Sequence, residues 1–296
     1  MPFYIQEKLL QKKNMQIFSI DTGLFKLDGG AMFGVVPKSI WNKENPADEN
    51  NMCSWAMRCL LVIDGTRKIL IDTGMGKKQS EKFFGYYYPH GEADLISSLA
   101  KHGLLPTDIT DVILTHLHFD HCGGAVSIEN EKLVLTFKNA TYWSNEIHWN
   151  DALHPNARER ASFLKENILP IQESGQLKFI EEKIGSRTFF TENISIQFVH
   201  GHTRSMMLPF INYHGKTIAY MADLIPSAAH IPLPYIMGYD MFPMTTLNEK
   251  ENFLNEAVEK DFILFFEHDP INECGTVLKT ERGFKKKDVF PLAQIK

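Results

Sequence analysis

The sequence predicts an α/β protein, because strand-like apolar runs alternate with helical patterns and a histidine-rich stretch directly follows one of these runs. Six short apolar runs typical of buried strands lie at residues 59–63, 68–71, 111–114, 194–199, 217–221 and 262–266. Segments with helical spacing at residues 93–102 and 247–260 separate some of them. Such alternation is typical of α/β folds.

Length and composition favour one folded unit. The chain has 296 residues, of which 44% are hydrophobic, and this content is ample for a substantial core. No repeat, low-complexity tract or Pro/Ser-rich linker divides the sequence. We therefore expect a single domain over residues 15–296, starting with a strand at 15–20, after a charged, irregular N-terminal extension over residues 1–14. The native start could even be Met15.

Charge and hydropathy bear on partners and location. The formal net charge of −5 supplies no basic surface for nucleic acid, so no nucleic-acid partner is expected. The N-terminus lacks the pattern of a secretory signal, and no apolar run reaches the length of a membrane span. We expect a cytoplasmic protein with no membrane partner. The four cysteines show no redox or zinc-ribbon spacing and are expected to be reduced thiols.

The most informative stretch is residues 115–124, which packs three histidines and an aspartate into six positions. His116 and His118 lie two residues apart and can point the same way from an extended loop, while Asp120 and His121 turn toward a neighbouring position. Imidazole nitrogens and carboxylate oxygens are ligands for divalent cations. The stretch therefore predicts two adjacent metal ions at the C-terminal end of a strand, where sites in α/β proteins usually lie.

This stretch resembles the Thr-His-x-His-x-Asp-His motif of the metallo-β-lactamase superfamily. Further elements of that family occur in the expected order: Asp-Thr-Gly at 72–74, Gly-His-Thr at 201–203, a strand followed by an aspartate at 223, and a strand followed by a histidine at 268. The resemblance implies a four-layer αβ/βα sandwich. In that fold two mixed sheets pack face to face with helices outside, and the metals lie at one edge.

The resemblance also implies a complete ligand set. One metal would be held by His116, His118 and His202. The other would be held by Asp120, His121 and His268. Asp223 would bridge both metals. These ligands are His116, His118, Asp120, His121, His202, Asp223 and His268. Asp72 would orient a ligand without binding metal. The set suits two divalent ions, zinc first, with manganese or iron also compatible.

The implied chemistry is hydrolytic. His118 favours hydrolysis, because the oxygen-reducing diiron branch of the family has a glutamate at that position. Two adjacent cations would share a hydroxide with a pKa near neutrality, and one of them would polarise a carbonyl or phosphoryl oxygen. Asp120 would hold this hydroxide and carry its proton to the leaving group, and Asp223 would set the metal separation. Asp120 and Asp223 are the expected catalytic residues.

Two loops indicate the substrate class. Residues 28–41 and 223–240 resemble loops of the subgroup containing quorum-quenching N-acyl-homoserine lactonases and methyl parathion hydrolase. This resemblance implies a lactonase-like enzyme with a small-molecule substrate, N-acyl homoserine lactones being the named expectation. An organophosphate triesterase or arylesterase is the alternative enzyme. A ligand-binding signalling module with little turnover is the alternative from another class, and the complete ligand set argues against it.

The same loops supply the candidate pocket residues. Their apolar members could line a groove for an acyl chain or could close the core beneath the site, whereas their polar members could replace the carbonyl-binding tyrosine that some lactonases carry shortly after the bridging aspartate. The candidates are Met32, Phe33, Val36, Trp41, His230, Tyr235 and Tyr239. The aromatic segment 83–88 would suit a lid, a homodimer contact or core packing. His148 lacks partners at ligand spacing and is left out of the site.

Overall fold

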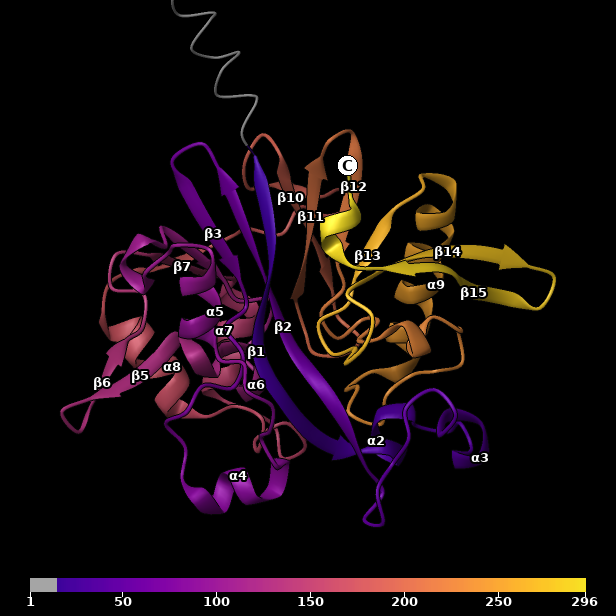
Figure 1. The fold of residues 1–296 in the computed structure, drawn as a ribbon, viewed down its shortest axis with the longest axis horizontal. Coiled ribbons are helices and arrows are strands. Elements are labelled where there is room, and N and C mark those ends of the chain that lie inside the picture. The colour runs from indigo at the N-terminus through magenta and orange to yellow at the C-terminus, as the bar shows by residue number, and fades with distance from the viewer. Residues whose placement is uncertain (1–14) are drawn as a thin grey trace, which may run out of the picture.

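Two β-sheets form the centre of the computed structural model, which describes residues 15–296. The first sheet comprises β1 (Gln16–Asp28), β2 (Met52–Asp64), β3 (Arg67–Ile71), β4 (Asp111–Ile113), β7 (Thr141–Ser144) and β8 (Leu177–Phe179), in that order. The second runs in space from β15 (Gly283–Phe290) through β14 (Cys274–Thr280), β13 (Ile263–Phe265), β12 (Lys216–Tyr220), β11 (Met206–Tyr213) and β10 (Ile194–Val199) to β9 (Thr188–Phe189). A separate hairpin pairs β5 (Val126–Glu129) with β6 (Lys132–Leu135). Figure 1 shows the two sheets side by side.

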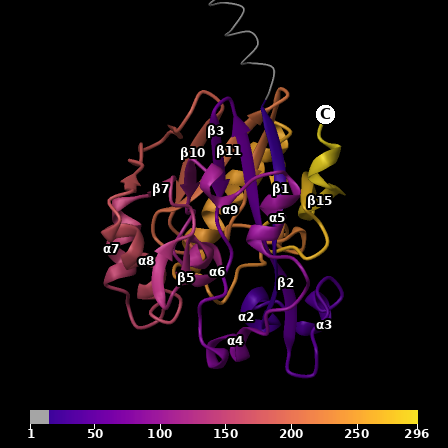
Figure 2. The ribbon, with the colours of Figure 1, turned by 60° about the vertical axis from the view of Figure 1, so that its left-hand side comes forward.

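Helices connect and cover the strands. They are α2 (Gly29–Phe33), α3 (Lys38–Trp41), α4 (Glu81–Tyr87), α5 (Leu95–Lys101), α6 (Phe119–Cys122), α7 (Glu146–Leu153), α8 (Lys165–Glu173) and α9 (Pro243–Glu259). Short 3-10 turns lie at Pro106–Asp108, Gly123–Ala125, Ala228–His230 and Leu292–Gln294. In Figures 1 and 2, α2, α3 and α4 gather at the same end of the sheets.

Side-chain alternation along β2 shows how the layers form. Successive residues of a strand point to opposite faces of the sheet. Leu60 and Val62 are buried in the core shared with the second sheet, whereas Leu61 is buried in a second core with Leu99 of α5. On the other side, α9 contributes Phe253 to the first of these cores. Both faces of each sheet are therefore covered, which explains why β2 reads as a continuous apolar run.

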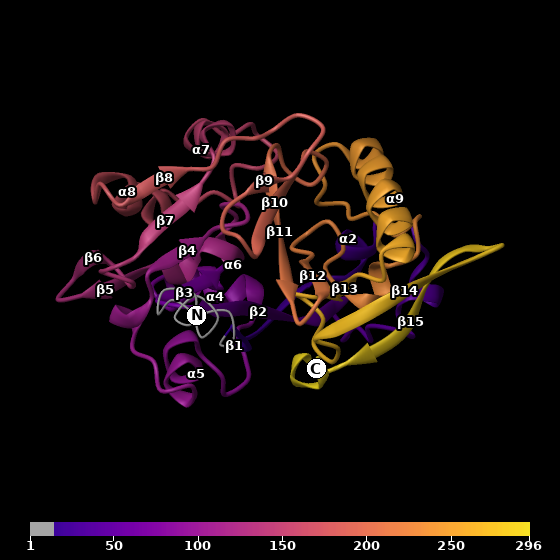
Figure 3. The ribbon, with the colours of Figure 1, turned by 90° about the horizontal axis from the view of Figure 1, so that it is seen from above.

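Seen from above, α5, the first sheet, the second sheet and α9 follow one another across the molecule (Figure 3). This is the four-layer αβ/βα sandwich that the family resemblance implies, and the prediction of the fold is confirmed. Within residues 15–296, no helix has the length and apolar content needed to cross a membrane. The expected extension over residues 1–14 lies outside the described residues, and the single domain over 15–296 stays a prediction.

The six predicted apolar runs all form strands, whereas element ends differ from expectation and two hairpins, β5–β6 and β14–β15, lie outside these runs. The expected helix at 247–260 starts earlier, at Pro243, which occupies the first turn, where a missing N–H costs nothing. The hairpin of β14 and β15 is absent from the prediction. Most of β15 is exposed, so its sequence shows no apolar run. Backbone pairing with β14 holds this segment as a strand.

Parallel pairing brings several strand ends to one edge. β3 runs parallel to β4 in the first sheet, and β12 runs parallel to β13 in the second. Each of these strands therefore ends on the same side as its neighbour, and the loops that follow lie together. This edge carries the polar residues described next.

Candidate metal centre

The seven predicted ligands all follow strand ends. His116 and His118 lie in the loop after β4, and α6 continues that loop with Asp120 and His121. The remaining three come from the second sheet, each a few residues beyond the end of β10, β12 or β13; they are His202, Asp223 and His268. All seven side chains are buried, and the structure brings them together from segments up to about half the chain apart.

The first group joins three histidines and one aspartate. Nδ1 of His118 lies 3.1 Å from Nε2 of His116 and 3.2 Å from Nε2 of His202. Oδ2 of Asp223 lies 3.0 Å from that same His202 nitrogen and 3.8 Å from the His116 nitrogen. The four ligand atoms lie within 4.8 Å of one another, as binding of a single cation requires.

The second group is adjacent and comprises Asp120, His121 and His268. The two imidazole Nε2 atoms lie 3.2 Å apart, and Oδ2 of Asp120 lies 3.8 Å from His121 and 3.9 Å from His268. Oδ1 of Asp223 approaches His268 Nε2 to 3.0 Å and His121 Nε2 to 3.6 Å. One carboxylate thus faces both groups, with a different oxygen toward each.

The outward ring nitrogens identify which atoms are free to bind a cation. Nδ1 of His202 donates to Oδ1 of Asp240 at 2.9 Å, and Nδ1 of His268 donates to the carbonyl of Ala56 at 2.7 Å. A neutral imidazole with one protonated nitrogen presents a bare lone pair at the other. The inward Nε2 atoms therefore converge as acceptors, and no residue from 15 to 296 donates a hydrogen bond to the buried Oδ1 of Asp223. A divalent cation satisfies these atoms together, so the residues fit metal ions.

Asp72 lies behind the ligands. Its Oδ1 accepts from the Thr115 amide at 2.7 Å, and its Oδ2 accepts from the Thr115 hydroxyl at 2.6 Å. The same Oδ2 lies 3.3 Å from Nδ1 of His121. Its backbone φ of 58° places Asp72 in the left-handed region, which turns the chain sharply after β3. Asp72 therefore holds the start of the ligand loop and the outward side of His121.

The electrostatics of the centre couple histidines to carboxylates. Burial disfavours the charged form of Asp223, but His202, His121 and His268 outweigh burial and hold the pKa of Asp223 well below its usual range. Burial likewise opposes a charged His202, yet Asp223 and Asp240 raise the pKa of His202 to about 10. Burial and neighbouring histidines hold the pKa of His116 well below its usual range. Protons and a cation therefore compete for the same inward atoms.

Sequence reasoning missed several residues around the ligands. Asp240 contacts His202 as described, and Oε2 of Glu267 lies 3.1 Å from Nδ1 of His121. Oε1 of Glu159 lies 3.6 Å from Nε2 of His118. Glu267 adjoins the predicted ligand His268, which was an available signal, but no pattern links Asp240 or Glu159 to a histidine far away along the chain.

His148 is not among the ligands, but it supports them. Its Nε2 accepts from the Leu117 amide at 2.9 Å, inside the ligand loop, and its Nδ1 donates to the carbonyl of Arg204 at 2.9 Å. Burial lowers the pKa of His148 to about 3, which keeps the ring neutral and able to accept. The residue thus ties the loop after β4 to the loop after β10.

The apolar pocket candidates belong to the core. Met32, Phe33 and Trp41 are at most 1% exposed, and Val36 is also buried beside them. The Phe33 ring stacks on Trp41 at 5.2 Å between centroids. In this structure these side chains close the core beneath the site, which is the alternative to lining an acyl groove. Their packing against one another leaves no surface for a ligand.

His230 is also a core residue. Its ring stacks on Phe33 with centroids 4.5 Å apart, and it is completely buried. Nε2 donates to the carbonyl of Met32 at 2.9 Å, and Nδ1 accepts from the Ser227 hydroxyl at 2.8 Å. With both nitrogens occupied, His230 has none to offer a substrate, which corrects its assignment to the pocket.

The two tyrosine candidates differ. Tyr235 is partly buried against the same core, whereas Tyr239 is 39% exposed. Burial raises the pKa of the Tyr239 phenol, and the charges of Asp28, Tyr87 and Asp120 add to this effect. The Tyr239 hydroxyl is therefore protonated at neutral pH.

The predicted aromatic segment forms α4 and packs toward the metal loop. Phe83 meets Phe119 edge to face at 5.2 Å, and Tyr87 lies 4.5 Å from the same ring. Phe119 directly precedes Asp120 in α6. These contacts place α4 beside the centre, and a homodimer contact through this segment stays a prediction.

The fold and the paired groups define a class of protein, and comparison with known families identifies it. The chain matches the metallo-beta-lactamase superfamily over residues 58–268 and belongs to that superfamily. A probable metal-dependent hydrolase from Staphylococcus aureus is 28% identical, with a TM-score of 0.84 over 93% of this chain and 96% of that chain. The chain is thus a member of this superfamily, and its residues form two adjacent groups that could hold metal ions.

Lactonases are among its relatives. An N-acyl homoserine lactonase of Bacillus cereus is 28% identical over 130 residues, which make up 40% of this chain and 46% of that protein. The match therefore spans less than half the length of that relative. AidC, a dizinc quorum-quenching lactonase in complex with a product, shares the fold with a TM-score of 0.75 and 23% identity over 94% of this chain and 96% of that chain.

Proposed function

We propose that this hydrolase opens lactone rings, with N-acyl homoserine lactones as the substrates, at two zinc ions. The observation that carries the proposal is the position of Asp223, whose two oxygens face two adjacent groups of ligand atoms. The lactonases among the relatives support the lactone substrate. The first ion would be held by His116, His118, His202 and Asp223, and the second by Asp120, His121, His268 and the other oxygen of Asp223.

Ions bound in these groups would supply an acidified water and a Lewis acid for the carbonyl oxygen. The chain's own residues then handle protons. Asp120 lies beside His121 and His268 at the second group, where it can accept a proton from the attacking water. As the bond between the carbonyl carbon and the ring oxygen breaks, Asp120 returns that proton to the ring oxygen, leaving a hydroxyl and a carboxylic acid, which releases the second proton of the water to solvent as it becomes a carboxylate.

We infer that Tyr239 meets the substrate carbonyl. Its phenol is partly exposed and protonated, so it can donate a hydrogen bond. Both of its neighbours are fixed: the Gly238 amide donates to the carbonyl of Ala31 at 2.7 Å, and Asp240 accepts from His202. Arg158 also donates to the Gly238 carbonyl. Such anchoring holds a hydroxyl in place before substrate binds.

The test uses protein reconstituted with zinc or manganese. N-decanoyl homoserine lactone is added, and acid release on ring opening is followed with a pH indicator. We expect release that a chelator abolishes and that added metal restores. The Asp223→Asn variant serves as the inactive control, and the surface variant Asp151→Asn, whose carboxylate pairs with Arg204 at 3.5 Å, serves as the matched active control.

Other substrate classes are outcomes of the same experiment. An aryl ester and an organophosphate triester are assayed beside the lactone at equal metal occupancy. Faster turnover of the triester than of the lactone would replace the proposal with a phosphotriesterase. No turnover of any of them, with both metals confirmed by elemental analysis and tight binding of the lactone, would favour the signalling module.

A further inference from the structure

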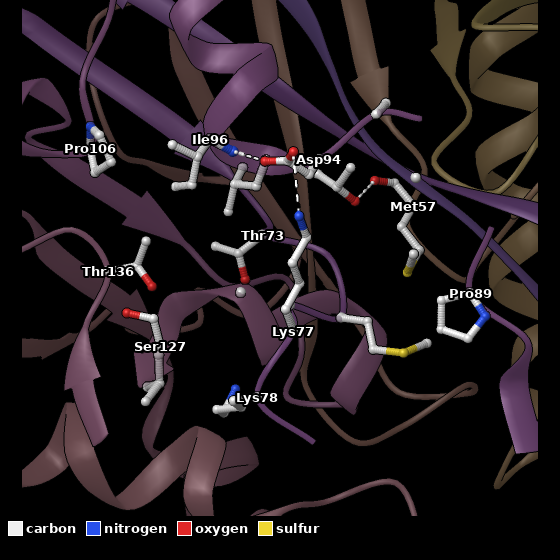
Figure 4. A pocket seen from close by; sticks show the side chains of 18 of the residues that line it. Met57, Thr73, Lys77, Lys78, Pro89, Asp94, Ile96, Pro106, Ser127 and Thr136 are labelled. Atoms are coloured by element: carbon white, nitrogen blue, oxygen red, sulfur yellow. Dashed lines mark hydrogen bonds and ion pairs between the residues drawn. The ribbon is translucent and has the colours of Figure 1, made fainter. Parts of the chain in front are cut away.

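A pocket of about 820 Å³ lies beside the metal loop and is separate from the metal centre. It is enclosed by the bend in β1, by residues 73–78, by the segment leading into α5 and by the β5–β6 hairpin. Figure 4 shows Thr73, Lys77, Lys78, Ser127 and Thr136 around this space. None of the seven predicted ligands is among its described lining residues. Its volume is that of sites for small organic molecules.

The walls of the pocket are chemically divided. Met57, Met75, Leu95 and Val126 are buried apolar residues that line it. On the polar side, the Thr136 hydroxyl oxygen is buried and has no hydrogen-bond partner within residues 15–296. Figure 4 shows this oxygen directed toward the space it shares with Ser127. Such a wall suits a molecule with an apolar body and a polar end.

Lys78 supplies an unbalanced positive charge. Its ammonium donates to the carbonyl of Gly123, and within residues 15–296 no carboxylate forms an ion pair with it; the charge of Glu166 acts on it only from a greater distance. Burial lowers the pKa of Lys78 to about 8, so the charged form is held at a cost. The adjacent Lys77 differs, because its ammonium lies 3.4 Å from Asp94 (Figure 4). An anion beside Lys78 would replace the missing partner.

We propose that this pocket binds a small amphipathic carboxylate, with its anionic end at Lys78 and its apolar body against Met57, Met75, Leu95 and Val126. The carboxylate oxygens also accept from the Thr136 hydroxyl. The site is distinct from the proposed lactone site and does not depend on the identity of the substrate turned over there.

The back wall of the pocket is the backbone that supports the metal loop. The amide and hydroxyl of Thr73 donate to the carbonyl of His121 at 2.8 and 2.9 Å. The Gly124 amide donates to the carbonyl of Gly74 at 2.8 Å, and a Cβ at Gly124 would come within 2.1 Å of the Thr73 carbonyl oxygen. A ligand in the pocket would therefore contact Thr73 on one side while His121 faces the metal centre on the other.

The experiment uses metal-loaded protein and decanoate as the probe, with calorimetry to measure binding and decanol as the uncharged comparison. We expect Lys78→Met to weaken decanoate binding by about tenfold or more, because a charge-assisted hydrogen bond is lost. Lys77→Met is the matched control and should leave binding within about twofold. Ser127→Trp is expected to fill the pocket and abolish binding while the lysine is retained.

A carboxylate could also bind at the metals, so the location of the probe is measured directly. Crystals of the metal-loaded protein are soaked with 10-bromodecanoate, and the bromine is located by its anomalous scattering. A bromine peak among the four apolar wall residues supports the proposal. A peak only at the metal centre, equal binding by Lys78→Met and Lys77→Met, or no binding at all would overturn it.

Discussion

Asp240 accepts a hydrogen bond from Nδ1 of His202 at 2.9 Å, and this contact connects the loop before α9 to the metal centre. Because Nδ1 keeps its proton, Nε2 of His202, which faces His118 and Asp223, is the nitrogen that a cation binds once it displaces the second proton. A carboxylate behind a ligating histidine fixes both the tautomer and the ring orientation. Asp240 is therefore a positioning residue for the first group.

Asp240→Asn should lower the affinity of the protein for its metals by about 10- to 100-fold, as loss of such a partner does elsewhere. The amide cannot accept the proton as strongly and can present its NH₂ group instead, which favours the wrong tautomer. Competition with a chromophoric chelator measures the affinity, with Asp151→Asn as the surface control. Unchanged affinity would show that His202 is oriented by its packing alone.

Asp223→Ala should reduce the content of both metals, because each carboxylate oxygen faces a different group. It should also abolish turnover. Elemental analysis of protein dialysed against trace metal gives the number of ions per chain. Retention of two ions would contradict the bridging position, whereas loss of one ion only would mean that Asp223 serves a single group.

Asp120→Asn tests proton transfer separately from metal binding. The amide keeps the shape of the side chain but cannot take up the proton, so kcat should fall by at least about 100-fold. Metal content is measured on the same sample. A fall in kcat that only follows a fall in metal content would assign Asp120 to binding and leave the proton carrier to another group.

His230→Ala and Tyr239→Phe should separate core from pocket. Removing the buried, fully hydrogen-bonded His230 ring should lower the free energy of unfolding by about 2–4 kcal/mol and leave KM for the lactone unchanged. Tyr239→Phe should leave stability nearly unchanged and lower kcat/KM by about tenfold through loss of one hydrogen bond to substrate. Reversed effects would exchange the two assignments.

Asp111 should make stability depend on pH. Burial alone would raise its pKa, but hydrogen bonds from Arg67, Thr110 and Trp143 lower it. Arg67 binds it through two nitrogens, at 2.6 and 3.0 Å. Because the folded pKa lies below the unfolded value of about 3.9, this contribution is present above that pH and is lost as pH falls through the folded pKa.

Asp111→Asn should therefore cost about 2 kcal/mol of unfolding free energy at pH 7, and the deficit relative to the parent protein should shrink as the pH falls below 4. The free energy of unfolding of both proteins is measured by urea unfolding at each pH. A chelator is present throughout, so that both proteins are free of metal and loss of metal does not affect the difference between them. A deficit that stays constant with pH would mean that the hydrogen bonds, and not the charge, carry the stabilisation.

Local patterns were sufficient for part of this protein. Apolar runs predicted six strands, since a buried strand needs only a few consecutive residues to be recognised. The spacing of His116, His118, Asp120 and His121 predicted ligands for two adjacent cations, because residues so close in a loop or short helix cannot lie far apart in space. The family resemblance extended this set along the chain.

Tertiary packing decided the rest. His202 meets Asp240, and His121 meets Glu267, only because strand ends from the two sheets meet at one edge, and no local spacing encodes such contacts. The same apolar loop pattern is compatible with a groove or a core; the mutual stacking of Phe33 and Trp41 made it a core. Lys78 reads as an ordinary surface lysine in sequence, and only the fold brings it to the wall of a pocket, where its ammonium donates to the carbonyl of Gly123. Periodicity is a property of neighbouring residues, whereas burial and pairing depend on where distant segments pack.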